Sequence, residues 1–135
     1  VIDLNNHPNT LTFIRQGVFL GGIGFVPKFL NNYIVTENMP LLSMDSKYNK
    51  LFMTYLFESE DYYKNVIFKN LPIGSAQKAL HEKEWLQSTV SVPILEEQEK
   101  IGNFFNKTDN LIELQTKKIE SLKQRKRGLL QKMFV

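Results

Sequence analysis

Histidines and clustered carboxylates are the residues of this 135-residue chain whose types could carry out acid–base or metal chemistry. His7 and His81 are the only histidines, and neither belongs to an H-x-x-x-H pair of metal ligands. Glu82 and Glu84 flank Lys83, which is a spacing typical of surface charge on a helix. We therefore expect no catalytic residue and no metal site.

Composition excludes further classes of site. The chain has no cysteine, so disulfides, cysteine-ligated metal centres and thiol catalysis are impossible. Its hydrophobic content of 42% and its ten phenylalanines are sufficient for a packed core. No stretch approaches the roughly 20 consecutive apolar residues of a membrane span. We expect a cytoplasmic protein that does not contact a membrane.

Side chains whose types could read DNA bases occur in the first 93 residues of the chain. Arginine and lysine suit guanine, whereas asparagine and glutamine suit adenine. The candidates are Arg15, Gln16, Lys28, Asn31, Asn32, Ser75, Gln77, Lys78, His81 and Lys83. The pairs Arg15-Gln16 and Gln77-Lys78 each lie beside a glycine, which would let the backbone turn sharply toward a groove. Ordinary loop solubility remains the alternative interpretation for every one of them.

The elements that must position these side chains follow from hydrophobic spacing and turn residues. Residues 1–93 have the pattern of an α+β domain with a small mixed or antiparallel sheet. The predicted strands are 11–17, 18–27, 33–36, 40–44 and 89–93. The predicted helices of this part are 49–69 and 81–86. Between these elements lie Lys28, Asn31, Asn32, Ser75, Gln77 and Lys78. Arg15 and Gln16 lie toward the end of a predicted strand, and His81 and Lys83 in the first half of a predicted helix.

The chain beyond Pro93 has helical composition and predicts two helices. The first would run from Leu95 to Phe105, and the second, of about 40 Å, from about residue 108 to 134. An imperfect heptad seam follows the long helix, and its apolar positions are Phe105, Ile112, Ile119, Leu122, Leu129 and Met133. We expect a projecting coiled-coil arm that forms a homodimer. A helix folded back on its own domain is the alternative.

Charge is unevenly distributed along the chain. Residues 98–135 carry nine Lys or Arg and four Asp or Glu, whereas residues 1–97 carry eight and ten. The formal net charge of +3 therefore comes from the C-terminal third. Such a surplus suits contact with phosphates, although charges along a long helix are also typical of a solvated face.

Two motifs resemble those of a known family. Val92–Ile101 reads V-P-x-L-E-E-Q-x-K-I, and Lys126–Phe134 reads K-x-x-L-L-Q-K-M-F. Both resemble the specificity subunit of type I restriction-modification systems, in which the first motif ends a target-recognition domain and the second ends a helical spacer. The segments Ile34–Asn38 and Gly74–Leu80 are similar to a strand and a G-x-x-Q-x-x-L loop of that family.

The resemblance implies a division of labour. Residues 1–93 would be a target-recognition domain that binds double-stranded DNA, with some strand missing before Leu11, and residues 94–135 a spacer and dimerisation region. The chain resembles half of a two-domain subunit. It would be non-catalytic and bind no cofactor, because the modification (methyltransferase) subunits bring S-adenosylmethionine and flip the adenine, and a restriction subunit joins later. A coiled-coil scaffold without DNA specificity is the alternative.

Overall fold

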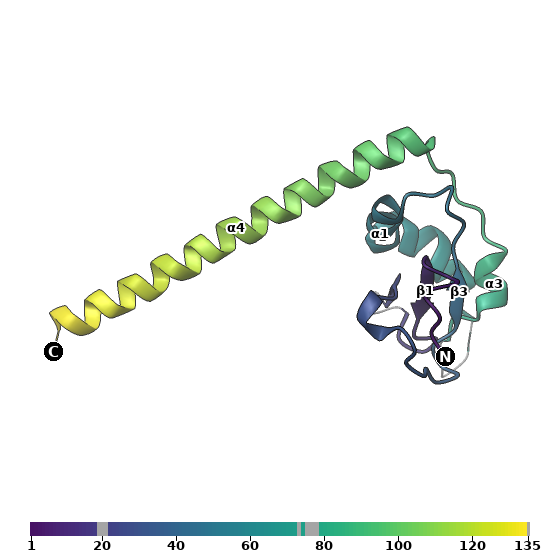
Figure 1. The fold of residues 1–135 in the computed structure, drawn as a ribbon, viewed down its shortest axis with the longest axis horizontal. Coiled ribbons are helices and arrows are strands. Elements are labelled where there is room, and N and C mark those ends of the chain that lie inside the picture. The colour runs from purple at the N-terminus through teal and green to yellow at the C-terminus, as the bar shows by residue number, and fades with distance from the viewer. Residues whose placement is uncertain (19–21, 73, 75–78, 135) are drawn as a thin grey trace. The chain divides into compact units, whose positions relative to one another are not determined.

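The fold was analysed in a computed structural model that describes residues 1–18, 22–72, 74 and 79–134 (Figure 1). The chain divides into two compact units, Val1–Gly102 and Asn103–Val135. The first unit contains a sheet and several short helices, and the second consists of the remainder of one long helix.

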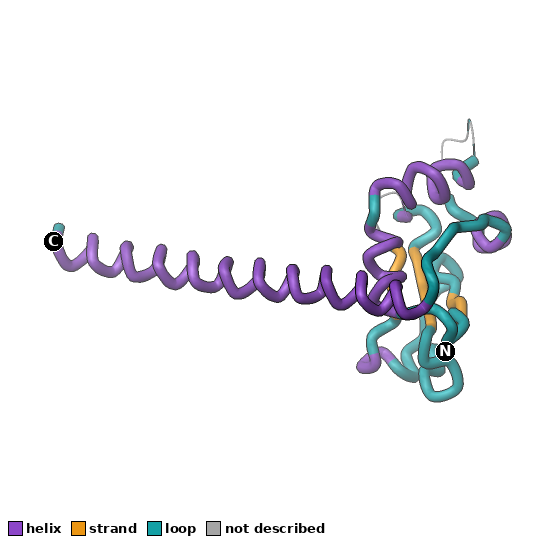
Figure 2. The backbone as a smooth tube through the Cα atoms, turned by 90° about the horizontal axis from the view of Figure 1, so that it is seen from above, coloured by secondary structure: helices purple, strands orange, loops and turns teal. Residues whose placement is uncertain are grey.

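A three-stranded antiparallel sheet lies at the centre of the first unit (Figure 2, orange). β1 (Thr10–Phe13) is the middle strand, with β2 (Ile23–Phe25) and β3 (Leu41–Ser43) on its two sides. In β1, Leu11 is paired with Phe25 of one neighbour and Leu42 of the other. A mixed or an antiparallel sheet was predicted, and the sheet is antiparallel. The predicted α+β class is confirmed.

Two predicted strands are wrong. Residues 33–36 form a loop because Tyr33 is used in another way: its N–H donates to Leu30 in a turn, and its carbonyl accepts from Ile2. Residues 89–93 also form no strand. Their β-branched side chains suit a sheet, but Pro93 lacks a donor for a ladder.

Helical structure fills residues 50–70, as predicted, with one break at Ser59. α1 (Lys50–Glu58) begins at Asn49, whose side-chain oxygen accepts from the Phe52 N–H at 2.9 Å. Ser59 ends this helix and caps α2 (Glu60–Tyr62). A π-helical turn, η3 (Tyr63–Ile67), and a 3₁₀ turn, η4 (Phe68–Asn70), continue it. The short predicted helix is α3 (Glu82–Leu86).

The hydrophobic core joins the sheet to these helices. Phe13, Val18 and Leu80 are its largest fully buried side chains. The indole of Trp85 meets the ring of Phe13 edge-on at 5.5 Å and donates its Nε1–H to the hydroxyl of Tyr62 at 2.8 Å. Trp85 therefore fixes α3 to the sheet through this aromatic contact and to the helical region through this hydrogen bond.

One continuous helix, α4 (Leu95–Met133), replaces the two predicted helices. The predicted break at residues 106–110 does not occur because these polar residues bond within the helix: the Thr108 hydroxyl donates to the carbonyl of Phe104, one turn earlier. The residues of α4 up to Gly102 belong to the first unit.

Candidate nucleic-acid interface

Arg15 is bound to Glu82 across 67 residues of sequence. Its Nε donates to one carboxylate oxygen at 3.0 Å and its Nη2 to the other at 2.6 Å, and Nη1 donates to the carbonyl of Glu37. Backbone hydrogen bonds join the same segments. The Leu80 N–H donates to the carbonyl of Arg15, and the Arg15 N–H donates to the carbonyl of Asn38. Arg15 therefore ties the end of β1 to two other segments.

This ion pair changes the acid–base properties of both groups. The hydrogen bonds from Arg15 hold the pKa of the Glu82 carboxyl below its ordinary value, and those to Glu82 raise the pKa of Arg15. The two side chains keep 26% and 35% of their surface exposed, so the pair lies at the domain surface. A base contact by Arg15 would have to share or replace its contact with Glu82.

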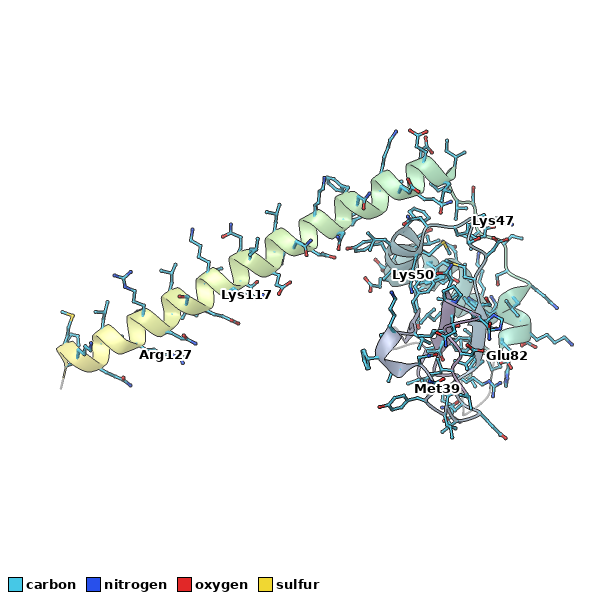
Figure 3. All side chains as sticks on the ribbon, in the orientation of Figure 1. Met39, Lys47, Lys50, Glu82, Lys117 and Arg127 are labelled. Carbon is cyan, nitrogen blue, oxygen red and sulfur yellow. The ribbon has the colours of Figure 1, made fainter. Side chains whose placement is uncertain are left out.

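Three other candidates lie in sequence beside this pair. Gln16 follows Arg15, and His81 and Lys83 flank Glu82 at the start of α3 (Glu82 is labelled in Figure 3). All three side chains are exposed. His81 occupies the N-cap position but makes no capping bond with its side chain. The structure thus brings four of the predicted residues to one junction around Glu82.

Lys28, Asn31 and Asn32 form a second group in the turn after β2. Lys28 begins the 3₁₀ turn η2 (Lys28–Leu30), and Asn31 follows it. The Asn31 side-chain oxygen accepts from the Leu4 N–H at 2.8 Å, so that atom has a structural role. Lys28 and Asn32 are exposed. Both views of the chain place η2 and α3 on opposite sides of the first unit, so the candidates do not form one patch (Figures 1 and 2).

Three predicted contacts, Ser75, Gln77 and Lys78, lie outside the described residues. Gly74, beside them, has a φ of +82°, which an L side chain rarely adopts. The glycine signal used for this loop therefore corresponds to an actual left-handed backbone position.

The predicted helix-pairing residues are all exposed along α4. Each has between 44% and 74% of its surface exposed, and they are Phe105, Ile112, Ile119, Leu122, Leu129 and Met133. Basic residues lie on the same stretch of helix, including Lys117 and Arg127 (labelled in Figure 3). Lys117 forms an ion pair with Glu113 one turn earlier. An amphipathic, basic helix is thus present in the second unit.

The start of α4 is held by residues that our sequence reasoning missed. Gln98 is 2% exposed; its carboxamide oxygen accepts from the Asn49 N–H at 2.9 Å and its nitrogen donates to the Pro93 carbonyl at 2.8 Å. One turn later, a Cβ on Gly102 would lie 2.9 Å from the backbone nitrogen of Phe52. Gln98 of the first motif and Gly102, directly after the motif, therefore join α4 to α1. A glutamine and a glycine four residues apart on a helix were the available signal.

In the part of the chain that the structure describes, no three His, Asp or Glu side chains form a group that could hold a metal ion. Among the described helices, none has the length and apolar character to cross a bilayer.

Comparison with known proteins assigns the family. Residues 3–124 match the family of the type I restriction modification DNA specificity domain. No curated protein and no solved structure gave a significant match. The matched range covers most of the chain, including the Arg15–Glu82 junction, the η2 turn and the start of α4. The chain belongs to the type I restriction modification DNA specificity domain family.

Proposed function

We propose that this chain is the sequence-reading, non-catalytic module of a cytoplasmic type I restriction-modification system. The match of residues 3–124 to the DNA specificity family is the observation that carries the proposal. The first unit reads a short sequence of double-stranded DNA. The chain itself binds no cofactor, and S-adenosylmethionine enters with the modification subunits.

Base reading is assigned to exposed polar residues of the first unit. Gln16, His81 and Lys83 adjoin the Arg15–Glu82 pair in the chain, and Asn32 lies in the turn that η2 begins. Lys28, the first residue of η2, is a further proposed DNA contact. A rigid domain that carries such side chains at its surface can present them to base edges at little entropic cost. Ser75, Gln77 and Lys78 belong to the same proposed set.

Assembly is assigned to α4. Its exposed apolar seam suits pairing with another helix, and we propose that two copies pair in antiparallel orientation. A two-fold axis would then give each pair two recognition units and a split, palindromic target. The modification subunits, and later the restriction subunit, dock on the paired helices and are positioned on this bipartite target.

A scaffold without DNA specificity is the second candidate. The exposed apolar residues of α4 favour it, because helix pairing alone would account for them. The first unit would then bind protein. Only the DNA-reading function predicts a base preference.

Selection from a random duplex pool tests the proposal. The full chain is mixed with the modification subunit, and bound duplexes are recovered and sequenced at several salt concentrations. We expect a short, two-part consensus whose binding weakens steeply with salt while the preference persists. Recovery of duplexes without any consensus, from a chain that still binds its modification subunit, would leave the scaffold as the function.

A further inference from the structure

A tight turn with an exposed aromatic side chain follows β2. Phe29 lies in the middle of η2 and is 77% exposed. A single exposed apolar side chain is ordinary on a protein surface, but Tyr33 and Ile34 of the same turn are also 60% and 83% exposed. Several exposed apolar side chains on one short ordered segment indicate a contact surface. The 27–34 turn, defined here as Pro27 to Ile34, holds this ring at the surface of the first unit.

Backbone hydrogen bonds fix the turn internally. The Leu30 N–H donates to Pro27, the Asn31 N–H to Lys28 and the Tyr33 N–H to Leu30, each at 3.0–3.1 Å. Asn32 has a φ of +70°, which reverses the chain direction.

The N-terminal segment fixes the same turn from outside. Ile2, itself 2% exposed, exchanges two backbone bonds with it: its N–H donates to Tyr33 at 2.9 Å and its carbonyl accepts from Asn32 at 2.8 Å. Leu4 donates to the side chain of Asn31. The backbone that carries Phe29 is therefore fixed before any partner arrives, which lowers the part of the entropic cost of binding that comes from ordering the turn.

Charge around the turn favours a polyanionic partner. Residues 22–36 contain Lys28 and no carboxylate. The ammonium of Lys50 lies 4.9 Å from the ring of Phe25, three residues before Lys28, and both lysines are exposed (Lys50 is labelled in Figure 3). The acidic residues nearby are Glu37, which follows this stretch, and Asp3 of the N-terminal segment, whose carboxylate stays charged and accepts hydrogen bonds from Asn5 and Asn6 of its own loop. An exposed ring directly beside Lys28 in the chain suits DNA better than an apolar protein surface.

We propose that the 27–34 turn inserts Phe29 between two base pairs from the minor groove of the target DNA. This proposal rests on the DNA-reading function proposed above. Lys28 contacts phosphate beside the groove, and the amide of Asn32 reads the minor-groove edge. Insertion unstacks one base step and kinks the duplex, so Phe29 selects for steps that deform easily, such as TA or CA.

The test uses the full chain with its modification subunit and the duplex recovered in the selection. 2-Aminopurine replaces adenine at each position of that duplex in turn, because its fluorescence rises when it unstacks. The variants are Phe29→Ala, Phe29→Leu and, as the matched control, Phe68→Ala. Phe68 is another phenylalanine on a short helical turn of the same unit and is 59% exposed.

We expect a fluorescence rise at one step with the unaltered chain and with Phe68→Ala. Phe29→Ala should remove the rise and weaken target binding by about 5- to 100-fold, as removal of one aromatic–base stacking interaction does. Phe29→Leu should retain the rise, because leucine also acts as a wedge.

Two results would overturn the insertion. One is a Phe29→Ala chain that keeps both the fluorescence rise and its affinity for DNA. The other is a Phe29→Ala chain that no longer binds the modification subunit while the unassembled chain binds DNA as before, which would make the turn a protein-docking site. If the unaltered chain shows no base preference at all, the DNA-reading function fails and the insertion fails with it.

Discussion

The guanidinium of Arg15 binds the carboxylate of Glu82 through two hydrogen bonds, one to each carboxylate oxygen, at 3.0 Å and 2.6 Å. The pair connects the end of β1 to the first residue of α3. A third nitrogen of Arg15, Nη1, donates to the carbonyl of Glu37. A residue type that we chose for reading guanine therefore has a structural role. Such bidentate pairs fix geometry because the planar fork matches the carboxylate.

Acid should remove the contribution of this pair to stability. The pKa of Glu82 in the folded protein lies below its ordinary value of 4.5 because of the bonds from Arg15. Stabilisation is therefore complete above pH 4.5 and is lost as the pH falls through the lowered value. Thermal unfolding should give Glu82→Gln a lower Tm than the unaltered chain at pH 7, with the difference vanishing in acid.

Glu84→Gln is the control for this experiment, because it removes an exposed carboxylate from the same short helix. It should leave the Tm nearly unchanged at both pH values. A charge-reversed double variant, Arg15→Glu with Glu82→Arg, should recover part of the decrease in Tm that either single variant shows. Equal decreases for Glu82→Gln and Glu84→Gln would show that the ion pair contributes nothing specific.

Gly102→Ala should destabilise the chain by about 1–3 kcal/mol, as overpacking of a close contact does. The new Cβ would lie 2.9 Å from the backbone nitrogen of Phe52, and the backbone cannot move aside as a flexible side chain would. Gly128→Ala is the matched control in the same helix, because nothing lies within 4 Å of its added Cβ.

Urea unfolding followed by circular dichroism measures both glycine variants. Gly128→Ala should be neutral or stabilising by up to about 1 kcal/mol, since alanine is the better helix former. Opposite signs for the two substitutions would show that the close approach of α4 and α1 matters. If both stabilise, the contact at Gly102 is looser than the structure indicates.

Tyr62→Phe should cost about 1–3 kcal/mol of unfolding free energy, because it leaves the buried indole N–H of Trp85 without its acceptor.

Burial also raises the pKa of Tyr62 to about 12. In the unfolded chain the same group ionises near 10. Stability should therefore fall as the pH rises from 10 toward 12, and Tyr62→Phe should make that fall shallower. If the stability of Tyr62→Phe falls as steeply between pH 10 and 12 as that of the unaltered chain, the fall does not come from Tyr62.

Local patterns predicted the elements better than the contacts between them. The 3.6-residue spacing of residues 49–69 and the heptad of the long helix depend on neighbours within a few turns, and both predicted helix correctly. Tyr33–Thr36 has strand composition, but the Tyr33 carbonyl accepts its hydrogen bond from Ile2 and the segment forms a loop. β-propensity reflects packing against partners that a sequence does not specify.

The candidate site illustrates the same limit. Residue type and a nearby glycine indicated Arg15, but its partner Glu82 is 67 positions away and looked like ordinary helix surface charge. Likewise, Gln98 belongs to a motif that we recognised, whereas its bond to Asn49 spans 49 positions. Pairing over such separations follows from the tertiary fold, so no local period or spacing could indicate it.

Helix pairing is expected to depend on the apolar seam of α4. Ile119→Asp with Leu122→Asp places two charges in the seam and should convert a dimer into a monomer at tens of micromolar. The control, Ser121→Asp with Gln124→Asp, places the same charges at positions outside the heptad seam. Sedimentation equilibrium, which distinguishes a monomer from a dimer, measures both double variants. A chain that is already monomeric at this concentration, and unaffected by the seam variant, would count against self-association.

Basic residues of α4 should contribute affinity for DNA without base preference. Five of them are neutralised to glutamine together: Lys117, Lys118, Lys123, Arg125 and Arg127. They lie on one continuous helix rather than on loops shaped to reach base edges, so phosphate contact is what their geometry suits. Binding to the selected duplex and to a scrambled duplex should weaken by a similar factor. The slope of log K against log salt should become shallower by about 1 for each phosphate that the variant no longer neutralises.

The control exchanges lysine for arginine and arginine for lysine at the same five positions. It keeps the charge of α4 and should retain the slope. If the neutralised variant instead selects a different sequence, α4 reads bases, and the division between a reading unit and an assembly helix does not hold.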